Sequence, residues 1–310
     1  MTDNASAIGP VPGDPEVCLP RPHHALWSDA WVRLRRNKLA VIGAVIIIIV
    51  ALAAIFAPLI TRFGYAKQDT AISLQPPNAV HWLGTDELGR DVFARLIYGA
   101  RTSLAVGIFT QFIVLLVGLP IGAIAGSMGG RVDNLLMRFV DIMYGFPDIL
   151  LIILLSAILR NSSFSKIGGG IFVIFLAIGL VSWVGVSRLV RSQILSLKQR
   201  DFVTAARAMG GKSRYITMRH LLPNSLGPII VAITFGIPRA IFAEAALSYI
   251  GIGIKPPTPS WGDMIQKGYN VMNADPSLML IPAIAIAILM LAFTFLGDGL
   301  RDALDPRLRR

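Results

Sequence analysis

Residues 201–223 read DFVTAARAMGGKSRYITMRHLLP, a polar and basic stretch that lies between two long apolar runs. The flanking runs, residues 167–187 and 226–250, are each about as long as the roughly 20 residues that a helix needs to cross the hydrocarbon layer of a membrane. The pattern therefore predicts a loop at one membrane surface, held between two membrane-spanning helices.

The composition of the whole chain is that of an integral membrane protein. Of its 310 residues, 54% are hydrophobic and only 15% are charged, and the mean hydropathy is +0.65. This is far too apolar for a soluble domain of this length. The net charge of +11 does not indicate nucleic acid, because the basic residues cluster beside apolar runs and do not alternate with aromatic ones. The single cysteine, Cys18, excludes an intramolecular disulfide.

Six spans are predicted, which makes the fold class all-α integral membrane. Four runs contain no charged residue: residues 39–61, 104–126, 167–187 and 276–297. Two more spans carry charges, residues 139–159 with Asp141 and Asp148, and residues 226–250 with Arg239 and Glu244. The predicted regions are an N-terminal tail and interfacial helix over 1–38, a membrane domain over 39–299, and a C-terminal tail over 300–310.

Lys and Arg are distributed unevenly between the two sides of this topology. The side that holds both termini and residues 201–223 carries 19 of them, the other side carries 9, and Arg239 lies within a span. Because cytoplasmic loops are enriched in Lys and Arg, both termini and residues 201–223 are predicted to be cytoplasmic.

The largest segment on the other side, residues 62–103, is predicted to contain a helix that lies on the membrane surface. Thr85 is its expected N-cap, with Asp86 and Glu87 in the first turn. Val92 and Leu96 would share its apolar face, while arginines such as Arg95 would lie elsewhere. We expect this segment to be scaffold.

Three glycines mark a helix-packing face in the second span. Gly118, Gly122 and Gly126 are four residues apart, so they line one face and allow another helix to approach closely. The alternative is that glycine is simply common in membrane helices. Pro120 and Pro147 are candidate kinks.

Charges inside spans are functional candidates, because burying them in lipid is costly. Arg239 and Glu244 are five residues apart, about 140° around a helix, so they do not pair with each other. Each would line a transport path, contact a second subunit, or lie near an interface. Asp148 follows Pro147 and is interpreted as a first-turn acid of a helix.

Residues 201–223 themselves predict a helix, a tight reversal and a second helix. Asp201 would cap the first helix, Gly210 would supply a left-handed stop, and Pro223 would end the second. The face that would dock in a groove of a partner consists of Phe202, Ala205, Ala206 and Met209. The alternative is a solvated basic loop, which would not require apolar residues at helical spacing.

The sequence offers no constellation for bond chemistry. Gly211, Lys212 and Ser213 resemble the end of a phosphate-binding loop, but Ala206 stands where that pattern requires a glycine. We therefore predict no catalytic residue, no metal site and no cofactor bound by this chain.

Residues 35–306 resemble the inner-membrane permeases of binding-protein-dependent ABC importers, in particular their C-type subunit for dipeptides, oligopeptides or nickel. Besides residues 201–223, the matching segments are 82–104, 129–147, 246–262 and 297–309. Thr204 departs from the pattern, which often has Glu there. The resemblance implies the six-helix type I importer permease fold, and coupling of residues 201–223 to an ATPase.

The resemblance also implies partners and a location. They are a homologous B-type permease subunit, two ABC ATPase subunits that bind ATP and Mg²⁺, and an extracytoplasmic solute-binding protein, in the bilayer of a bacterial inner membrane. This chain would form half of a path for peptides; nickel or oligosaccharides are alternative substrates. An ion-coupled secondary transporter is a rival, but it predicts inverted repeats that the sequence does not show. A membrane anchor or assembly scaffold would leave the docking-type loop unexplained.

Overall fold

A computed structural model describes residues 26–162 and 170–305, and within these residues it contains helices and no named strand. Five helices are long and apolar enough to cross a membrane, and a bent pair brings the number of possible spans to six. The five contain α2 (Lys38–Ile55), α4 (Val92–Met128), α7 (Ile171–Leu197), α10 (Leu222–Tyr249) and α12 (Ser277–Leu304). The bent pair is α5 (Gly130–Tyr144) and α6 (Asp148–Arg160). The prediction of an all-helical membrane fold is confirmed.

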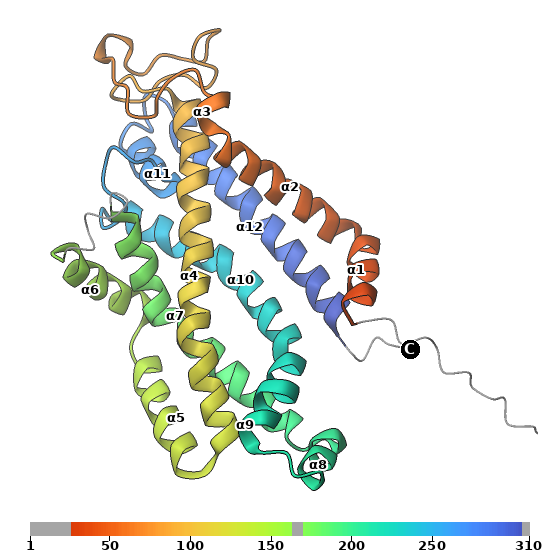
Figure 1. Cartoon of the computed structure of the whole chain (residues 1–310). Helices are drawn as coiled ribbons and strands as arrows, with labels where there is room; N and C mark the ends of the chain where they lie inside the picture. Colours follow the sequence, from red (N-terminus) through yellow and green to blue (C-terminus); the bar gives the residue numbers. More distant parts are fainter. Residues whose placement is uncertain (1–25, 163–169, 306–310) are drawn as a thin grey trace, which may run out of the picture.

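The long helices run between two ends of the molecule (Figure 1). At one end lies the short helix α8 (Asp201–Ala208), near the junction of α4 and α5. At the opposite end lie the short helices α3 (Ala57–Ile60) and η1 (Thr70–Ile72), the loops that follow, and the amphipathic helix α11 (Trp261–Asn270). We call the first the α8 end and the second the α11 end.

The helix pair α4 and α7 forms the central seam, and the three glycines of α4 lie on it. A Cβ atom at Gly118 would lie 2.9 Å from the carbonyl oxygen of Trp183, and one at Gly126 would lie 2.9 Å from Cβ of Ile194. At Gly122 a Cβ would collide with the carbonyl oxygen of Ser187. Because these three glycines have no side chain, the backbones of α4 and α7 can approach this closely.

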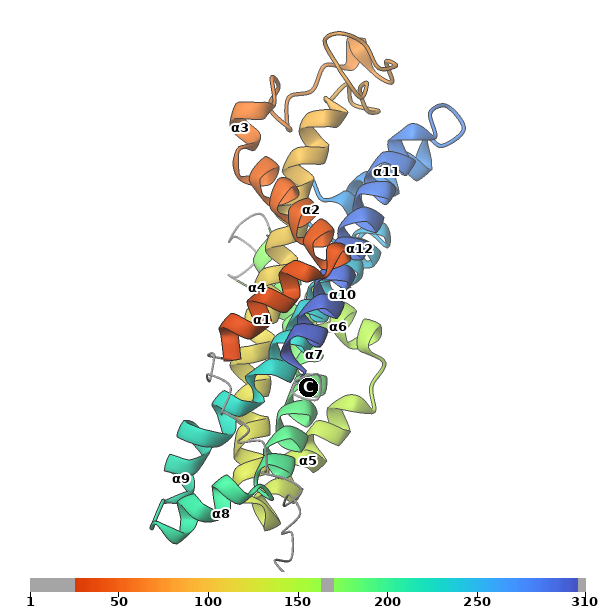
Figure 2. The ribbon, with the colours of Figure 1, turned by 90° about the vertical axis from the view of Figure 1, so that its right-hand side faces the viewer.

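The expected interfacial helix is α1 (Leu26–Arg36), and it packs against α12 beside the start of α2 (Figure 2). Asn37 separates α1 from α2 and caps α2, because its side-chain oxygen accepts a hydrogen bond from the backbone N–H of Ala40 at 3.2 Å. Residues 1–25 lie outside the described part of the chain, so the expected tail is not described.

The prediction of a separate surface helix before the second span is wrong. The second span and the residues before it form one continuous helix, α4, whose N-cap is Asp91 and not Thr85. Asp91 accepts a hydrogen bond from the backbone N–H of Ala94 at 2.7 Å. Thr85 instead accepts one from the backbone N–H of Gln75, so it stabilises the preceding loop. Asp86 and Glu87 therefore lie outside the helix.

The third span differs in shape from the prediction. The residues just before the predicted span 139–159 are also helical and belong to α5, and the chain bends by 88° between α5 and α6. The bend falls at Pro147, which restricts the residue before it to extended geometry, and α6 then begins at Asp148, as expected. Two ion pairs hold α5 to α7, from Arg191 to Asp133 at 2.5 Å and from Arg188 to Asp141 at 2.6 Å.

Candidate coupling surface and transport face

Helix α8 ends in a left-handed turn. Gly210 has φ +84°, its N–H donates to the carbonyl of Arg207 at 2.9 Å, and the N–H of Gly211 donates to the carbonyl of Ala206 at 3.0 Å. These two bonds form a Schellman motif, which satisfies the last carbonyls of the helix. The start of α8 differs from the prediction: the N-cap is Arg200, and Asp201 is the first helical residue without a capping bond. As a first-turn acid, Asp201 still interacts favourably with the helix dipole.

The expected docking face divides into two faces. Ala206 is buried, together with Val203, against Ile216 and Leu221, so these residues fasten α8 to the body of the protein. Phe202 and Ala205 are exposed, and Met209 is 82% exposed. We call Phe202, Ala205 and Met209, together with the exposed side chains Tyr215 and Met218, the coupling surface.

The second helix of the loop does not end at Pro223. The helical turns α9 (Ser213–Ile216), a π turn (Thr217–Leu221) and α10 form one helical run from Ser213 to Tyr249. Proline lacks an N–H and clashes with the carbonyl four residues earlier, and the wider π turn just before Pro223 relieves that conflict. The coupling surface is therefore continuous with the transmembrane helix α10.

A groove of about 710 Å³ begins at Arg200, the residue before α8. Helices α1, α7, α10 and α12 form its walls. Its α10 wall is mostly apolar and includes Pro228, Val231 and Phe235, whereas Arg33, Arg200 and Arg301 come from the other sides. Because Arg200 adjoins α8, the groove lies at the α8 end of the molecule.

The two charged residues of α10 occupy different environments. Arg239 is exposed, and the described residues offer its guanidinium no hydrogen bond or ion pair. Glu244 is fully buried, and its carboxylate accepts a hydrogen bond from the Ser248 hydroxyl at 2.7 Å. Its other oxygen, Oε2, has no partner within the described chain. Glu244 therefore faces the packed side of α10 towards α11, and Arg239 faces away from it.

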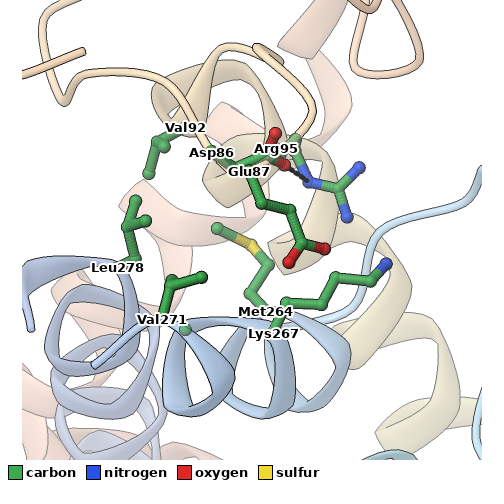
Figure 3. A pocket seen from close by; sticks show the side chains of 9 residues that line it. Asp86, Glu87, Val92, Arg95, Met264, Lys267, Val271 and Leu278 are labelled. Carbon is green, nitrogen blue, oxygen red and sulfur yellow. Dashed lines mark ion pairs between the residues drawn. The ribbon is translucent and has the colours of Figure 1, made fainter. Parts of the chain in front are cut away.

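A buried ion cluster occupies the α11 end. The Arg95 guanidinium is 3.0 Å from the Asp263 carboxylate of α11 and 3.5 Å from Asp86, and Arg90 is 2.7 Å from Asp86. Lys267 adds a contact of 2.8 Å to Asp263. Figure 3 shows Asp86 and Arg95 beside the α11 side chains Met264 and Lys267. The cluster fastens the loop before α4 to α11, although Arg95 was expected on a surface face.

Family comparison agrees with this architecture over most of the chain. A family model described as the inner membrane component of binding-protein-dependent transport systems matches residues 118–310. The chain belongs to this family. A second model, the N-terminal transmembrane domain of oligopeptide transport permease C, matches residues 25–77. This transport permease therefore has a multi-span membrane architecture, and membership implies ATPase and permease partners.

Several relatives align with almost the whole permease. The oligopeptide transport system permease protein OppC of Bacillus subtilis is 41% identical over 286 residues, covering 92% of this chain and 91% of that protein. The dipeptide transport system permease protein DppC of Alkalihalophilus pseudofirmus is 44% identical over 283 residues, covering 91% and 90%. The glutathione transport system permease protein GsiD of Escherichia coli O6:K15:H31 is 39% identical over 289 residues, covering 91% of each chain.

A solved structure shares the fold. A chain of the MetNI methionine ABC transporter in an inward-facing conformation superposes with a TM-score of 0.56 at 22% identity. The match covers 69% of the permease and 97% of that chain. At this level of identity it supports the helical architecture alone.

Sequence reasoning missed three features of these sites. Val203 was not assigned, although its spacing of three residues from Ala206 could have indicated the buried side of α8. The partner of Arg95 was not predictable, because Asp263 lies 168 residues away in sequence. The π turn before Pro223 has no signal beyond the proline itself.

Proposed function

We propose that this permease is one of two membrane subunits of an ATP-driven importer of dipeptides or oligopeptides. The names of the relatives support this substrate class, since they include oligopeptide, dipeptide and glutathione permeases. The proposed partners are a B-type permease, two ATPase subunits and an extracytoplasmic binding protein. ATP and Mg²⁺ would bind to the ATPase subunits, where hydrolysis would occur.

The coupling surface is the observation that carries this proposal. An apolar face on a short helix, fixed by the buried Val203 and Ala206 and ended by a Schellman turn, suits transmission of movement from a groove of a partner. Since α9 runs into α10 without a break, displacement of α8 would tilt a membrane-spanning helix. Nucleotide-driven closure of the ATPases would thus reorient the permease pair.

The orientation follows from the charge distribution. In the predicted topology the side holding the termini and residues 201–223 carries 19 Lys and Arg against 9 on the other side, so we assign the α8 end to the cytoplasm. The α11 end would then face the binding protein. The exposed face of α10, with Arg239 and the groove below it, would form this subunit's half of the transport path.

The test is ATP hydrolysis by the complete complex in proteoliposomes, with binding protein and peptide added or withheld. We expect hydrolysis to rise when both are present, and only when this chain is part of the complex. A complex that responds to a nickel chelate or an oligosaccharide, and not to peptide, would contradict the substrate class. Failure of the chain to associate with any ATPase would contradict the coupling role.

A further inference from the structure

One side of α10 forms a continuous stripe that is partly buried at Pro228, Val231 and Phe235 and exposed at Arg239 and Phe242. Pro228, Val231 and Phe235 line the groove, and Arg239 and Phe242 follow at intervals of four and three residues, so they lie on the same side of the helix. Phe242 is 58% exposed. The groove lining on α10 ends at Phe235, one helical turn before Arg239, so the stripe continues the α10 wall of the groove towards Arg239.

Arg239 lies deep within this stripe. It is about 26 Å along the helix axis from Leu222 and about 15 Å from Tyr249, at a rise of about 1.5 Å per residue. A lipid-facing guanidinium at such a depth is strongly disfavoured, so this face of α10 borders water or protein. Glu244 does not neutralise it, because Glu244 is fully buried on another side of the helix.

The chemistry of the stripe is selective for one kind of group. Arg239 is the only ionisable residue among the five of the stripe, so it is the single cation on this side of α10, whereas Arg33, Arg200 and Arg301 lie on the other walls of the groove. A planar guanidinium donates two parallel hydrogen bonds to a carboxylate, which gives this pairing its geometric specificity. Every unmodified peptide, whatever its sequence, ends in one α-carboxylate.

We propose that Arg239 binds the C-terminal carboxylate of the peptide during its passage through the membrane. This inference rests on the proposed function, since it requires peptides as substrates. It assigns to the permease a recognition step that is independent of side-chain sequence. The apolar neighbours of Arg239 would contact the peptide without selecting among its side chains.

The experiment compares two forms of one tripeptide, with a free or an amidated C-terminus. The binding protein is loaded to saturation with either form, and loading is verified first, so that its own affinity does not enter the comparison. Transfer into proteoliposomes is then measured for the unaltered complex and for complexes carrying Arg239→Gln, Arg239→Lys or Arg101→Gln. Arg101 is an exposed cation of α4 outside the α10 stripe and serves as the matched control.

We expect Arg239→Gln to slow transfer of the free acid about tenfold, the effect of losing one charge-assisted pair, and to leave the amide unaffected. Arg239→Lys should recover part of the transfer rate of the free acid, and Arg101→Gln should change the transfer rate of neither peptide. Equal slowing of both peptides would overturn the proposal in favour of a contact with the partner permease. Unchanged transfer of both would also overturn it. Absence of peptide transfer in the unaltered complex would instead contradict the proposed function.

A second measurement does not depend on transport. Because Cys18 is the only cysteine, Cys18→Ser provides a background in which Arg239→Cys is the sole thiol. We expect a charged, water-soluble thiol reagent to label this cysteine in the assembled complex, since the position borders an aqueous path. A folded complex whose thiol resists the reagent would place the residue against lipid or protein and overturn the proposal.

Discussion

The two ends of this permease differ in the burial of their charged and apolar side chains. At the α11 end the charged side chains of Arg90 and Arg95 are each 2% exposed and lie within an ion cluster. At the α8 end the apolar side chains of Phe202 and Met209 are 41% and 82% exposed. The ion cluster buries charge and α8 exposes apolar side chains, each against the usual tendency, although apolar side chains such as Trp82 are also exposed at the α11 end.

This contrast indicates which of the two features, the ion cluster or the coupling surface, is satisfied within the single chain. The ion cluster joins residues far apart in sequence, so its charges are paired within this chain. The coupling surface has no covering residue within residues 26–162 and 170–305, and under the proposed function a second protein would bury it. Substitutions at the α11 end are therefore expected to affect stability, and those at the coupling surface to affect assembly.

The largest loss of stability is expected for Arg95→Leu. Removing this guanidinium leaves Asp263 and Asp86 with less compensation in a buried site, and breaking a buried ion pair typically costs about 3–5 kcal/mol. Thermal denaturation of the purified chain in detergent measures the loss. Arg101→Leu is the control, because Arg101 is exposed on the same helix. Equal melting temperatures for both variants would remove the distinction between the two ends.

This ion cluster also marks the limit of what the sequence could predict. Apolar runs located the spans, because membrane thickness fixes helix length, and the 88° bend fell at the predicted proline. Arg95, however, belongs to an amphipathic pattern that suits a surface helix equally well. Its burial depends on α11, which packs against α4 through a hydrogen bond from the Trp261 indole to the Leu96 carbonyl.

The coupling surface was also only partly predictable from the sequence. The helix, its left-handed stop at Gly210 and its apolar composition follow from local rules of helix capping and periodicity. The division between buried Ala206 and exposed Met209 does not, because it depends on how α8 rests against the side chain of Ile216. Local geometry was therefore predictable, and the orientation of α8 was not.

A smaller loss is expected for Gly122→Val, which affects the seam that connects the two ends. The new side chain would collide with the backbone carbonyl of Ser187 on α7, and overpacking of this kind costs typically about 1–3 kcal/mol. Gly185→Val on α7 is the matched control, since no atom lies within 4 Å of a Cβ placed there. Denaturation in detergent compares the two, and an equal effect would mean that helix propensity, not close packing, accounts for the loss.

Gly210→Val is expected to have a still smaller effect on stability but to uncouple transport. A Cβ at Gly210 meets nothing within 4 Å, so the penalty is that of a β-branched residue in left-handed geometry, about 1–2 kcal/mol. Relief of that strain would reorient α8. Peptide uptake per ATP hydrolysed is the measurement, at matched membrane abundance.

Gly210→Asn is the control for this prediction, because Asn tolerates left-handed geometry. It should retain coupling where Gly210→Val loses it. Peptide uptake that is unchanged in Gly210→Val would contradict the assignment of residues 201–223 as the coupling element.

The smallest effect on stability, and the sharpest test of the comparison, is expected for Met209→Ser. Because the Met209 side chain is already 82% exposed, its removal should change the free energy of unfolding by less than about 0.5 kcal/mol. If the ATPase covers this side chain, however, binding of the ATPase should weaken by about 1–2 kcal/mol, roughly five- to thirtyfold in affinity. Val203→Ser should have the opposite pattern of effects. Because Val203 is fully buried within the chain, its loss should reduce the free energy of unfolding more than the affinity for the ATPase. Parallel measurements of melting temperature and ATPase affinity therefore separate the two faces of α8, and a Met209 variant that binds the ATPase normally would mean that the partner docks elsewhere.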